Sequence, residues 1–489
     1  MIFKTKPFDH QRAIFEKRSD LEGDCLFLEQ GTGKTKCAID NFAYLYLQGK
    51  IDGVLILAPN GVQRNWITDE IPAHLCDEVA RQTRSMCWQS SRAGTKRHER
   101  EAEEILRHKG LAVMAMGYEA FMSAKGKVFA KQFLTGKKVF YVLDEATRIK
   151  TPGAKRTKTV LASAKYAKYR RILTGTPAAN GPFDVYSQVR FAHPDFWKKN
   201  GLGDFFAFKT FFGLFEKGFN SATGQSFDSL VGYQNLEQLH KMLDRISVRV
   251  LKDDVLDLPP KLYTVRYFEP SREQMRIYNQ LVGDFIAYLS DGREVAAPLA
   301  IVRLLRFQQV LCGYLPTNKL DKDGYLLSEM ELVRLDENPR LRLLEEICED
   351  TPHKAIIWAR FTEDIDQIME LLGRKAVRYD GRVSDKDRAA AKIAFQSGDA
   401  QFFVANPAAA GEGLTLHSAK TVIYYNNTFK LSERLQSEDR AHRAGLKHAV
   451  QYIDIAAQDT VDEDVLQALR SKIDVASEIT GDKLKEWVL

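Results

Sequence analysis

The sequence predicts an α/β protein with two tandem lobes, each a parallel sheet flanked by helices, and with helical insertions between them. The first observation is length, because 489 residues are enough for about two or three domains. The second is that short apolar runs fall into two series and alternate with amphipathic stretches, as βα units require. The third is a change of pattern between the two series, over residues 191–338, to aromatic-rich helical stretches.

The first series of apolar runs predicts the strands of lobe one. Gly, Pro or Asn bounds the runs, and a helix-like segment at residues 36–46 follows the first of them. We assign residues 1–190 to lobe one and residues 191–257, with a helical stretch at 205–219, to a helical insertion of that lobe. The predicted strands are residues 25–28, 54–58, 111–116, 139–143 and 171–173.

The second series predicts lobe two over residues 338–470, with a helix-like segment at 386–395. Before it, Leu258 is followed by two prolines, which exclude a continuous helix. Residues 258–337 are therefore expected to form a linker and a helical insertion of lobe two, with a helical stretch at 272–289. Residues 471–489 are expected to form a C-terminal helix that packs back on the lobes. The predicted strands are residues 355–358, 376–379, 402–404, 421–425 and 451–455.

Composition indicates a globular protein inside the cell. Hydrophobic residues make up 44% of the chain and charged residues 28%, which is enough to build sizeable cores. No run approaches the ~20 apolar residues of a membrane span, and residues 1–9 lack the apolar core of a signal peptide. We expect a cytoplasmic location in a bacterium or in the host cell of a virus or mobile element, and a nuclear one in a eukaryote.

The cysteines indicate neither disulfides nor a zinc ribbon. They lie far apart in the sequence and form no Cys-x-x-Cys pair, so buried free thiols are expected. The six are Cys25, Cys37, Cys76, Cys87, Cys312 and Cys348.

The net charge of +6 says little for a chain of this length, but basic residues gather locally. Residues 146–183 contain no acid, which favours a surface that follows a phosphate backbone. A solvated helix face is the alternative. The basic residues are Arg148, Lys150, Lys155, Arg156, Lys158, Lys165, Lys168, Arg170 and Arg171.

The sharpest local signal is a glycine-rich run between a predicted strand and a predicted helix, Glu29-Gln30-Gly31-Thr32-Gly33-Lys34-Thr35. Its glycines let backbone N–H groups converge on phosphates, its lysine reaches the β and γ phosphates, and its final threonine hydroxyl can bind Mg²⁺. Leu28 stands where the full pattern has a first glycine. The run therefore predicts a phosphate-binding loop. The alternative is a chance match to the pattern.

Two acids, Asp144 and Glu145, follow the apolar run 139–143. At the carboxyl edge of a strand in the same lobe as Lys34, Asp144 can hold Mg²⁺ partly through water. Glu145 can orient and deprotonate the water that attacks the γ phosphate. A helix N-cap without chemistry is the alternative.

Two arginines in lobe two, Arg440 and Arg443, are three residues apart, which predicts one face of a helix. Directed at a nucleotide, two guanidinium groups stabilise charge on the transferring phosphate. The alternative is a pair on a helix surface, bonded to Glu438 or Asp439.

Taken in order, these residues resemble the motifs of superfamily 2 helicases and, within them, of the Swi/Snf-type double-stranded DNA translocases. The phosphate loop is similar to motif I and residues 144–150 to motif II, and the resemblance covers nearly the whole chain. In lobe one it continues at residues 8–11 (motif Q), 57–59 with Asn65 and Trp66 (motif Ia) and 173–180 (motif III). In lobe two it continues at residues 356–362 (motif IV), at Asp380 and Gly381 with Arg388, and at 410–416 (motif V) and 436–443 (motif VI).

The Swi/Snf-type branch is favoured by residues 148–150, 174–180, 258–261 and 439–443. Two residues depart from its pattern. Thr147 replaces the usual histidine of motif II, which concerns how hydrolysis is relayed to motif III. Glu412 adds an acid to the motif V loop.

The resemblance implies two RecA-like lobes with ATP and Mg²⁺ in the cleft between them, and a DNA strand across motifs Ia, III, IV and V. Catalysis would rest on Lys34, Asp144, Glu145, Gln436, Arg440 and Arg443, with Thr35 and Asp144 at the metal. The nucleotide would contact Phe8, Gln11, Gly31, Thr32, Gly33, Lys34, Thr35 and Gly413. The nucleic acid would contact Asn65, Trp66, Arg148, Lys150, Asn180, Arg360, Thr362, Gly411 and Thr415.

Three functions follow from this pattern. Translocation along double-stranded DNA is favoured, because residues 428–435 are too few for the β-hairpin wedge of many strand-separating relatives. A strand-separating or branch-migrating helicase is the first alternative, and a nucleic-acid-binding nucleotide switch without turnover is the second. We expect duplex or branched DNA as partner, no membrane and a monomer. Because the two lobes use nearly the whole chain, we expect a protein partner or the helical insertions to supply targeting.

Overall fold

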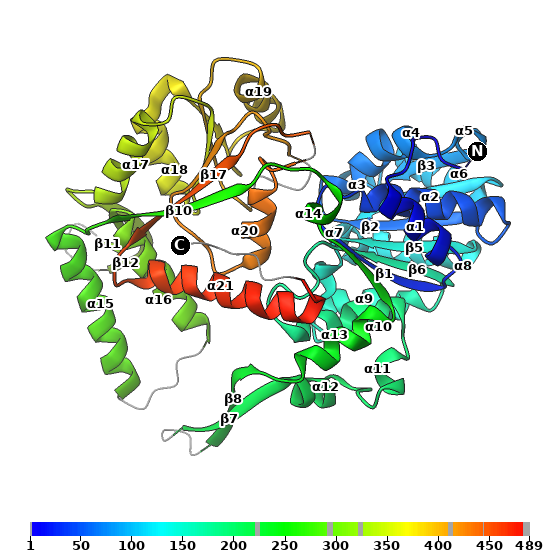
Figure 1. Ribbon diagram of the computed structural model, residues 1–489, viewed down its shortest axis with the longest axis horizontal. Helices are drawn as coiled ribbons and strands as arrows, with labels where there is room; N and C mark the ends of the chain where they lie inside the picture. The colour runs from blue at the N-terminus through cyan, green and yellow to red at the C-terminus, as the bar shows by residue number, and fades with distance from the viewer. Residues whose placement is uncertain are drawn as a thin grey trace. The chain divides into compact units, whose positions relative to one another are not determined.

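The computed structural model describes residues 2–220, 225–290, 297–320, 326–408, 414–443 and 445–482. The chain forms two compact units, and each is built on its own parallel sheet (Figure 1). This confirms the predicted fold class. Unit one contains the described residues of Met1–Leu214, Gly232–Asp257 and Ile473–Leu484, and unit two contains those of Phe215–Val231 and Leu258–Lys472.

The sheet of unit one has seven parallel strands in the order β3-β4-β2-β5-β6-β1-β9. All five predicted strands are confirmed, and every residue of β1, β2, β4 and β5 is buried. The two edge strands were not predicted. The strands are β1 (Gly23–Leu28), β2 (Gly53–Ala58), β3 (Thr83–Cys87), β4 (Leu111–Gly117), β5 (Val139–Asp144), β6 (Tyr169–Leu173) and β9 (Ser247–Val250).

Helices lie on both faces of this sheet, because two apolar core clusters form, one on either side of the buried strands. The helices that carry or support site residues are α1 (Asp9–Arg18), α2 (Lys34–Leu47), α3 (Val62–Asn65), the π-helical turn η1 (Trp66–Glu70), α4 (Ile71–His74), α7 (Tyr118–Met122) and η3 (Ala146–Ile149). The others are α5 (Asp77–Ala80), α6 (Lys96–Arg107), α8 (Ala124–Gly136), α9 (Lys155–Ala164), α10 (Val185–Ala192), α11 (Phe196–Lys199), α13 (Leu236–Asp244) and α14 (Lys252–Val255).

The sheet of unit two has six parallel strands in the order β10-β17-β16-β13-β15-β14. The five predicted strands are confirmed, and the edge strand β10 was not predicted. The strands are β10 (Lys261–Phe268), β13 (Ala355–Trp358), β14 (Ala376–Tyr379), β15 (Phe402–Ala405), β16 (Thr421–Tyr424) and β17 (Val450–Ala457). The helices beside them are α17 (Pro339–Glu349), α18 (Thr362–Leu372), α19 (Asp385–Gln396) and α20 (Leu431–Glu438).

The insertions are less helical than the sequence predicts. The predicted helix at 205–219 is wrong in its second half, because α12 (Phe205–Phe212) ends at Gly213 and the chain continues as β7 (Gly213–Asn220), paired with β8 (Gln225–Tyr233). Glycine weakens a helix, and Gly213 and Gly218 both lie in the half that forms the strand. The region 191–257 also supplies β9 to the main sheet.

In residues 258–337 the helix predicted at 272–289 is confirmed as α15 (Arg272–Ser290). A second helix, α16 (Ala297–Leu311), and an antiparallel pair, β11 (Tyr314–Leu320) with β12 (Leu326–Arg334), were not predicted. The final described helix, α21 (Val461–Thr480), begins ten residues before the predicted one at 471, and its Ile479 belongs to a core cluster of unit one.

Two further expectations concern the cysteines and membrane-spanning segments. All six cysteines are free, and all except the half-buried Cys87 are buried. Among the described residues, no helix has both the length and the apolar character that a membrane span requires.

Candidate nucleotide site and nucleic-acid surface

The phosphate loop joins the buried strand β1 to helix α2. Gly31 and Gly33 have positive φ values of 90° and 84°, a conformation that glycine adopts without strain. Gly33 is the N-cap of α2, so the amide groups of the first helical turn, at Lys34 and Thr35, face the loop. This backbone is therefore shaped to hold phosphate groups, as the sequence predicts.

The motif Q residue Gln11 supports this loop from α1. Its side chain is buried, and Nε2 donates a hydrogen bond of 3.2 Å to the carbonyl of Thr32, which His10 also contacts at 2.8 Å. A Cβ atom on Gly33 would lie 2.0 Å from Gln11 Nε2, so only glycine fits there. Phe8 is 52% exposed beside this contact, and its ring stacks on that of His10, with centroids 5.8 Å apart.

Asp144 is the last residue of β5 and is 7% exposed. Its Oδ2 accepts a hydrogen bond of 2.7 Å from Trp66 Nε1, and its Oδ1 accepts one of 3.1 Å from the Glu145 amide. Its own carbonyl accepts from the Tyr118 hydroxyl at 2.9 Å. Burial raises the pKa of the Asp144 carboxyl, against the lowering effects of Lys34 and of the Trp66 hydrogen bond.

Trp66 was predicted to contact DNA, and the structure contradicts this. The side chain is 1% exposed, and its only polar group donates to Asp144. The neighbouring Asn65 is half-buried and Arg64 is exposed. A buried indole N–H usually has a partner, and a partner 78 residues away cannot be read from sequence spacing.

The residues predicted to bind Mg²⁺ fit that ion. Thr35 supplies a hydroxyl oxygen in the first turn of α2, and Asp144 supplies a carboxylate close enough to Lys34 for its pKa to respond. Mg²⁺ prefers one or two carboxylates together with phosphates and water, which this donor set allows.

Glu145 adopts a left-handed backbone conformation, with φ 52° and ψ 61°. Its Oε1 accepts a hydrogen bond of 2.7 Å from Thr147 Oγ1 and one of 3.4 Å from Thr174 Oγ1. Thr174 follows β6 in motif III and is fully buried. The threonine in the place of the usual histidine thus contacts the same carboxylate as motif III does, which links motifs II and III.

Motif III and the basic residues of motif II share an acid that the sequence analysis did not single out. Asp184 Oδ2 accepts from Asn180 Nδ2 at 2.9 Å and from its backbone amide at 3.0 Å, and lies 3.4 Å from Lys150 Nζ. Two residues predicted to contact DNA therefore lie together. Arg148 is exposed nearby, on η3.

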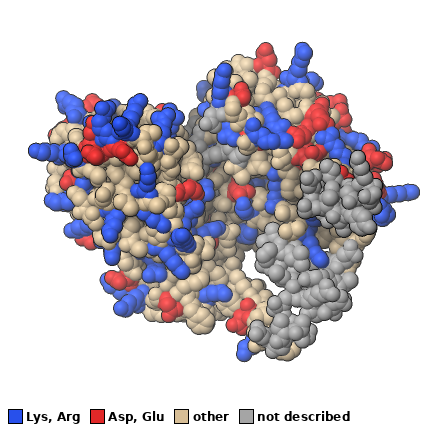
Figure 2. All heavy atoms as spheres, turned by 180° about the vertical axis from the view of Figure 1, so that it is seen from behind, with Lys and Arg blue, Asp and Glu red and all other residues tan. Residues whose placement is uncertain are grey.

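The one-signed surface predicted for residues 146–183 is only partly present. Arg171 is 1% exposed and donates to Asn41 and to backbone carbonyls, so it holds the fold together. Arg156 and Lys168 pair with Glu119 and Glu22. On the face drawn in Figure 2, acidic side chains lie between the basic ones.

A separate polar hollow of about 420 Å³ lies beside motif Ia. Arg64 and Thr68 line it together with Arg84, Arg92 and the acid Glu101. Arg84 also pairs with Glu104, so Arg64 and Arg92 are the candidate contacts for phosphates.

In unit two, the prediction that one helix carries both arginines of motif VI is wrong. Helix α20 contains Gln436 but ends at Glu438; Arg440 lies in the turn that follows and Arg443 in an irregular stretch after it. Arg440 is 2% exposed and contacts the carbonyl of Leu414 at 3.4 Å. Arg443 donates to Thr415 Oγ1 at 2.5 Å, so the described end of motif V contacts motif VI. Gly411, Glu412 and Gly413 lie outside the described residues.

The linker that contains the two prolines also contacts motif VI. Nε2 of His442 lies 2.8 Å from the carbonyl oxygen of Pro259, and Lys261 Nζ lies 2.8 Å from Glu438 Oε2. These residues belong to one family pattern, but their separation in the sequence does not indicate that they touch.

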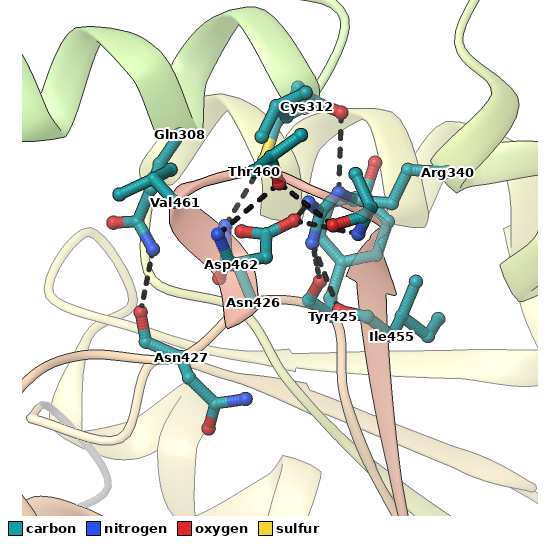
Figure 3. A network of polar contacts seen from close by, with 12 residues as sticks. Gln308, Cys312, Arg340, Tyr425, Asn426, Asn427, Ile455, Thr460, Val461 and Asp462 are labelled. Carbon is teal, nitrogen blue, oxygen red and sulfur yellow. Dashed lines mark hydrogen bonds and ion pairs between the residues drawn. The ribbon is translucent and has the colours of Figure 1, made fainter. Parts of the chain in front are cut away.

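A buried polar network of unit two includes Gln308, Arg340 and Asp462 (Figure 3), and motif IV contacts it through Gln308. Arg360 NH1 donates to Gln308 Oε1 at 2.5 Å, and Gln308 Nε2 donates to the carbonyl of Asn427 at 3.0 Å. Arg340, which is fully buried, donates to the carbonyl of Leu311 at 3.2 Å and pairs with Asp462. Helix α16 is thereby attached to the sheet, and Arg360 is held half-buried. Thr362, at the start of α18, is exposed.

Two parallel-sheet units with a phosphate loop in the first define a helicase-like ATPase. A sequence model of the SNF2-related domain matches residues 15–310, and one of the helicase conserved C-terminal domain matches residues 339–445. The first match covers more than half of this chain, so the chain belongs to the SNF2-related family.

The chain is 27% identical over 457 residues to a "Probable chromatin-remodeling complex ATPase chain" of Oryza sativa subsp. japonica, covering 91% of this chain and 38% of that protein. It is 25% identical over 480 residues to "Transcription regulatory protein SNF2" of Saccharomyces cerevisiae, covering 92% and 26%. The chain spans less than half the length of these curated relatives. It also matches the structure "Sulfolobus solfataricus SWI2/SNF2 ATPase core in complex with dsDNA", at 22% identity and a TM-score of 0.41, over 98% of this chain and 95% of that one.

Proposed function

We propose that this SNF2-family ATPase is a translocase on double-stranded DNA that uses ATP and Mg²⁺ to move along DNA or to remodel DNA–protein complexes. One observation carries the proposal. Unit one combines a backbone loop that can hold phosphates with two acids whose carboxylates accept hydrogen bonds. Trp66 donates to Asp144, and Thr147 donates to Glu145. A nucleotide switch without turnover would have no need of a positioned Glu145.

In this proposal the residues of unit one divide the chemistry. The loop amides and Lys34 bind the phosphates, and Thr35 and Asp144 hold the metal ion, which neutralises phosphate charge when bound. Glu145 orients the attacking water and accepts its proton, and Thr147 and Thr174 fix the direction of its carboxylate. Arg440 and Arg443 of unit two are proposed to stabilise charge on the transferring phosphate.

The proposed DNA contacts are mostly to phosphates, which gives little sequence preference. Asn65 and the arginines of the hollow beside motif Ia, Arg148 with the Lys150 and Asn180 pair, and Thr362 are the proposed contacts. Arg360 and Thr415 are proposed to act partly by orienting their neighbours, because both already have side-chain partners. Movement requires that affinity for DNA differ between the nucleotide states.

Duplex translocation is preferred to strand separation for one reason. All residues between Asn427 and Gln436 are described, and they form a short loop and the start of α20, with no β-hairpin. Strand separation remains the second candidate. We also propose that the protein acts as a monomer inside the cell, with targeting by a protein partner.

The experiment that tests this function compares phosphate release in the presence of duplex, single-stranded and branched DNA and of RNA. Duplex DNA should stimulate most. Stimulation by RNA alone, or by no nucleic acid, would refute a DNA motor. Stimulation by branched or single-stranded DNA well above duplex would favour the second candidate.

A further inference from the structure

The contact between Trp66 and Asp144 joins motif Ia to the proposed metal site. The indole N–H donates to Oδ2 over 2.7 Å, and the Glu145 amide donates to Oδ1 over 3.1 Å. With one donor on each oxygen, the carboxylate is fixed in rotation. Each oxygen keeps acceptor capacity for a further partner, since a carboxylate has about four lone-pair sites.

The chain builds this contact with an irregular helix. The segment that follows β2 begins as α3, widens into the π-helical turn η1 at Trp66, and resumes as α4. A π-helical turn is rare and occurs often at functional sites, because it redirects a side chain that a regular helix would point elsewhere. Trp66 is the first residue of that turn and is 1% exposed, so its ring cannot leave the contact without opening the core.

We propose that Trp66 is a positioning residue for the magnesium-binding carboxylate of Asp144. This inference rests on the proposed function, because it assumes that Asp144 binds the metal ion of a nucleotide. A group that orients a metal ligand through a hydrogen bond contributes about 10- to 100-fold to metal affinity. Tyr118 holds the Asp144 backbone, but Trp66 is the side chain that directs the metal-facing group.

The variant Trp66→Phe removes the N–H donor and keeps an aromatic ring in the core. Trp197→Phe is the matched control, because Trp197 is also 1% exposed and its Nε1 donates to the Tyr186 carbonyl at 2.9 Å, outside the nucleotide site. Affinity for a fluorescent ATP analogue is measured in excess EDTA and during a Mg²⁺ titration. For Trp66→Phe the affinity in EDTA should stay within about twofold of wild type, while the Mg²⁺ concentration at half-maximal gain rises about 10-fold. Trp197→Phe should change neither.

A Mg²⁺ response of Trp66→Phe equal to that of Trp197→Phe would overturn the inference, as would an equal loss of affinity with and without Mg²⁺. If the wild type itself gained no affinity from Mg²⁺, the proposed function would fail and the inference would fall with it. A second measurement covers the case in which Trp66→Phe does not fold. In ¹⁵N-labelled wild-type protein, the indole N–H signal of Trp66, assigned by elimination with Phe variants of the other tryptophans, should shift between ADP in EDTA and ADP with Mg²⁺. The Trp197 signal should stay in place, and an unmoved Trp66 signal would overturn the inference.

Discussion

The Nζ atom of Lys261 lies 2.8 Å from Oε2 of Glu438, which connects the first residue after the two prolines to the end of helix α20. Glu438 is fully buried and also accepts from Tyr263 and Arg434, at 2.8 and 2.9 Å. A buried carboxylate with three donors is well compensated. Because Arg440 is two residues further on, this contact fixes the start of the segment that carries the motif VI arginines.

The first prediction concerns the stability that this contact supplies. Burial alone would raise the pKa of Glu438, but Lys261 and Arg434 outweigh it and lower the pKa to about 2. A folded-state pKa below the unfolded value of about 4.3 means that the ionised group stabilises the fold above that pH and loses this effect as the pH falls toward 2. Glu438→Gln should therefore lower the free energy of unfolding by about 3 kcal/mol at pH 7, and by less at pH 3.

Urea denaturation at the two pH values measures this difference. Glu433→Gln is the control, because Glu433 lies on the same helix and pairs with the exposed Lys430 at 2.7 Å. Its effect should be below about 1 kcal/mol. Equal effects of the two variants at pH 7, or a Glu438→Gln effect that does not change with pH, would disprove the prediction.

The second prediction concerns the two halves of the nucleotide site. Lys34→Ala should lose ATP binding and turnover together, because the lysine binds the phosphates. Glu145→Gln should keep ATP bound but lower turnover about 10²- to 10⁴-fold, since only the base is lost. Equilibrium ATP binding and phosphate release measure the two effects, with the exposed Asp20→Asn as control. Near-normal turnover in either variant would disprove the roles proposed for Lys34 and Glu145.

The third prediction concerns Arg443. Arg443→Ala should leave ATP binding nearly unchanged and reduce DNA-stimulated hydrolysis about 10³-fold, and Lys should rescue poorly because it lacks the planar fork. Thr415→Val, which removes the partner of Arg443, is the control for a purely structural role. Arg440 is a poorer probe, because it is 2% exposed and Arg440→Ala should also lower the melting temperature. Wild-type turnover in Arg443→Ala would refute the role in hydrolysis.

The fourth prediction concerns salt. If DNA binds through phosphate contacts, the logarithm of affinity should fall with the logarithm of salt concentration, at a slope near −0.9 for each contact. Duplex-stimulated ATPase activity should weaken in parallel. Arg64→Ala at the hollow should reduce the slope by about one. If the stimulation of ATPase activity by duplex DNA did not change with salt concentration, this would contradict a DNA interface built on phosphate contacts.

The central strands and the phosphate loop were predictable, because continuous apolar runs and glycines with positive φ leave a local signal. Edge strands were missed for a physical reason. β3 is Thr-Arg-Ser-Met-Cys, of which Met86 alone is buried, so its apolar signal is weak. The prediction that Arg443 lies on a helix was wrong, because residue spacing does not reveal that α20 ends at Glu438. The role of Trp66 depends on a partner 78 residues away, which only the folded sheet brings close.

The measurement that tests duplex translocation most directly is the ATP-dependent displacement of a triplex-forming strand from otherwise intact duplex DNA. Wild-type protein should displace the third strand with ATP and leave the duplex paired, and Glu145→Gln should bind the same DNA without displacing it. Failure of the wild type to displace the third strand, while it hydrolyses ATP in response to duplex DNA, would contradict translocation.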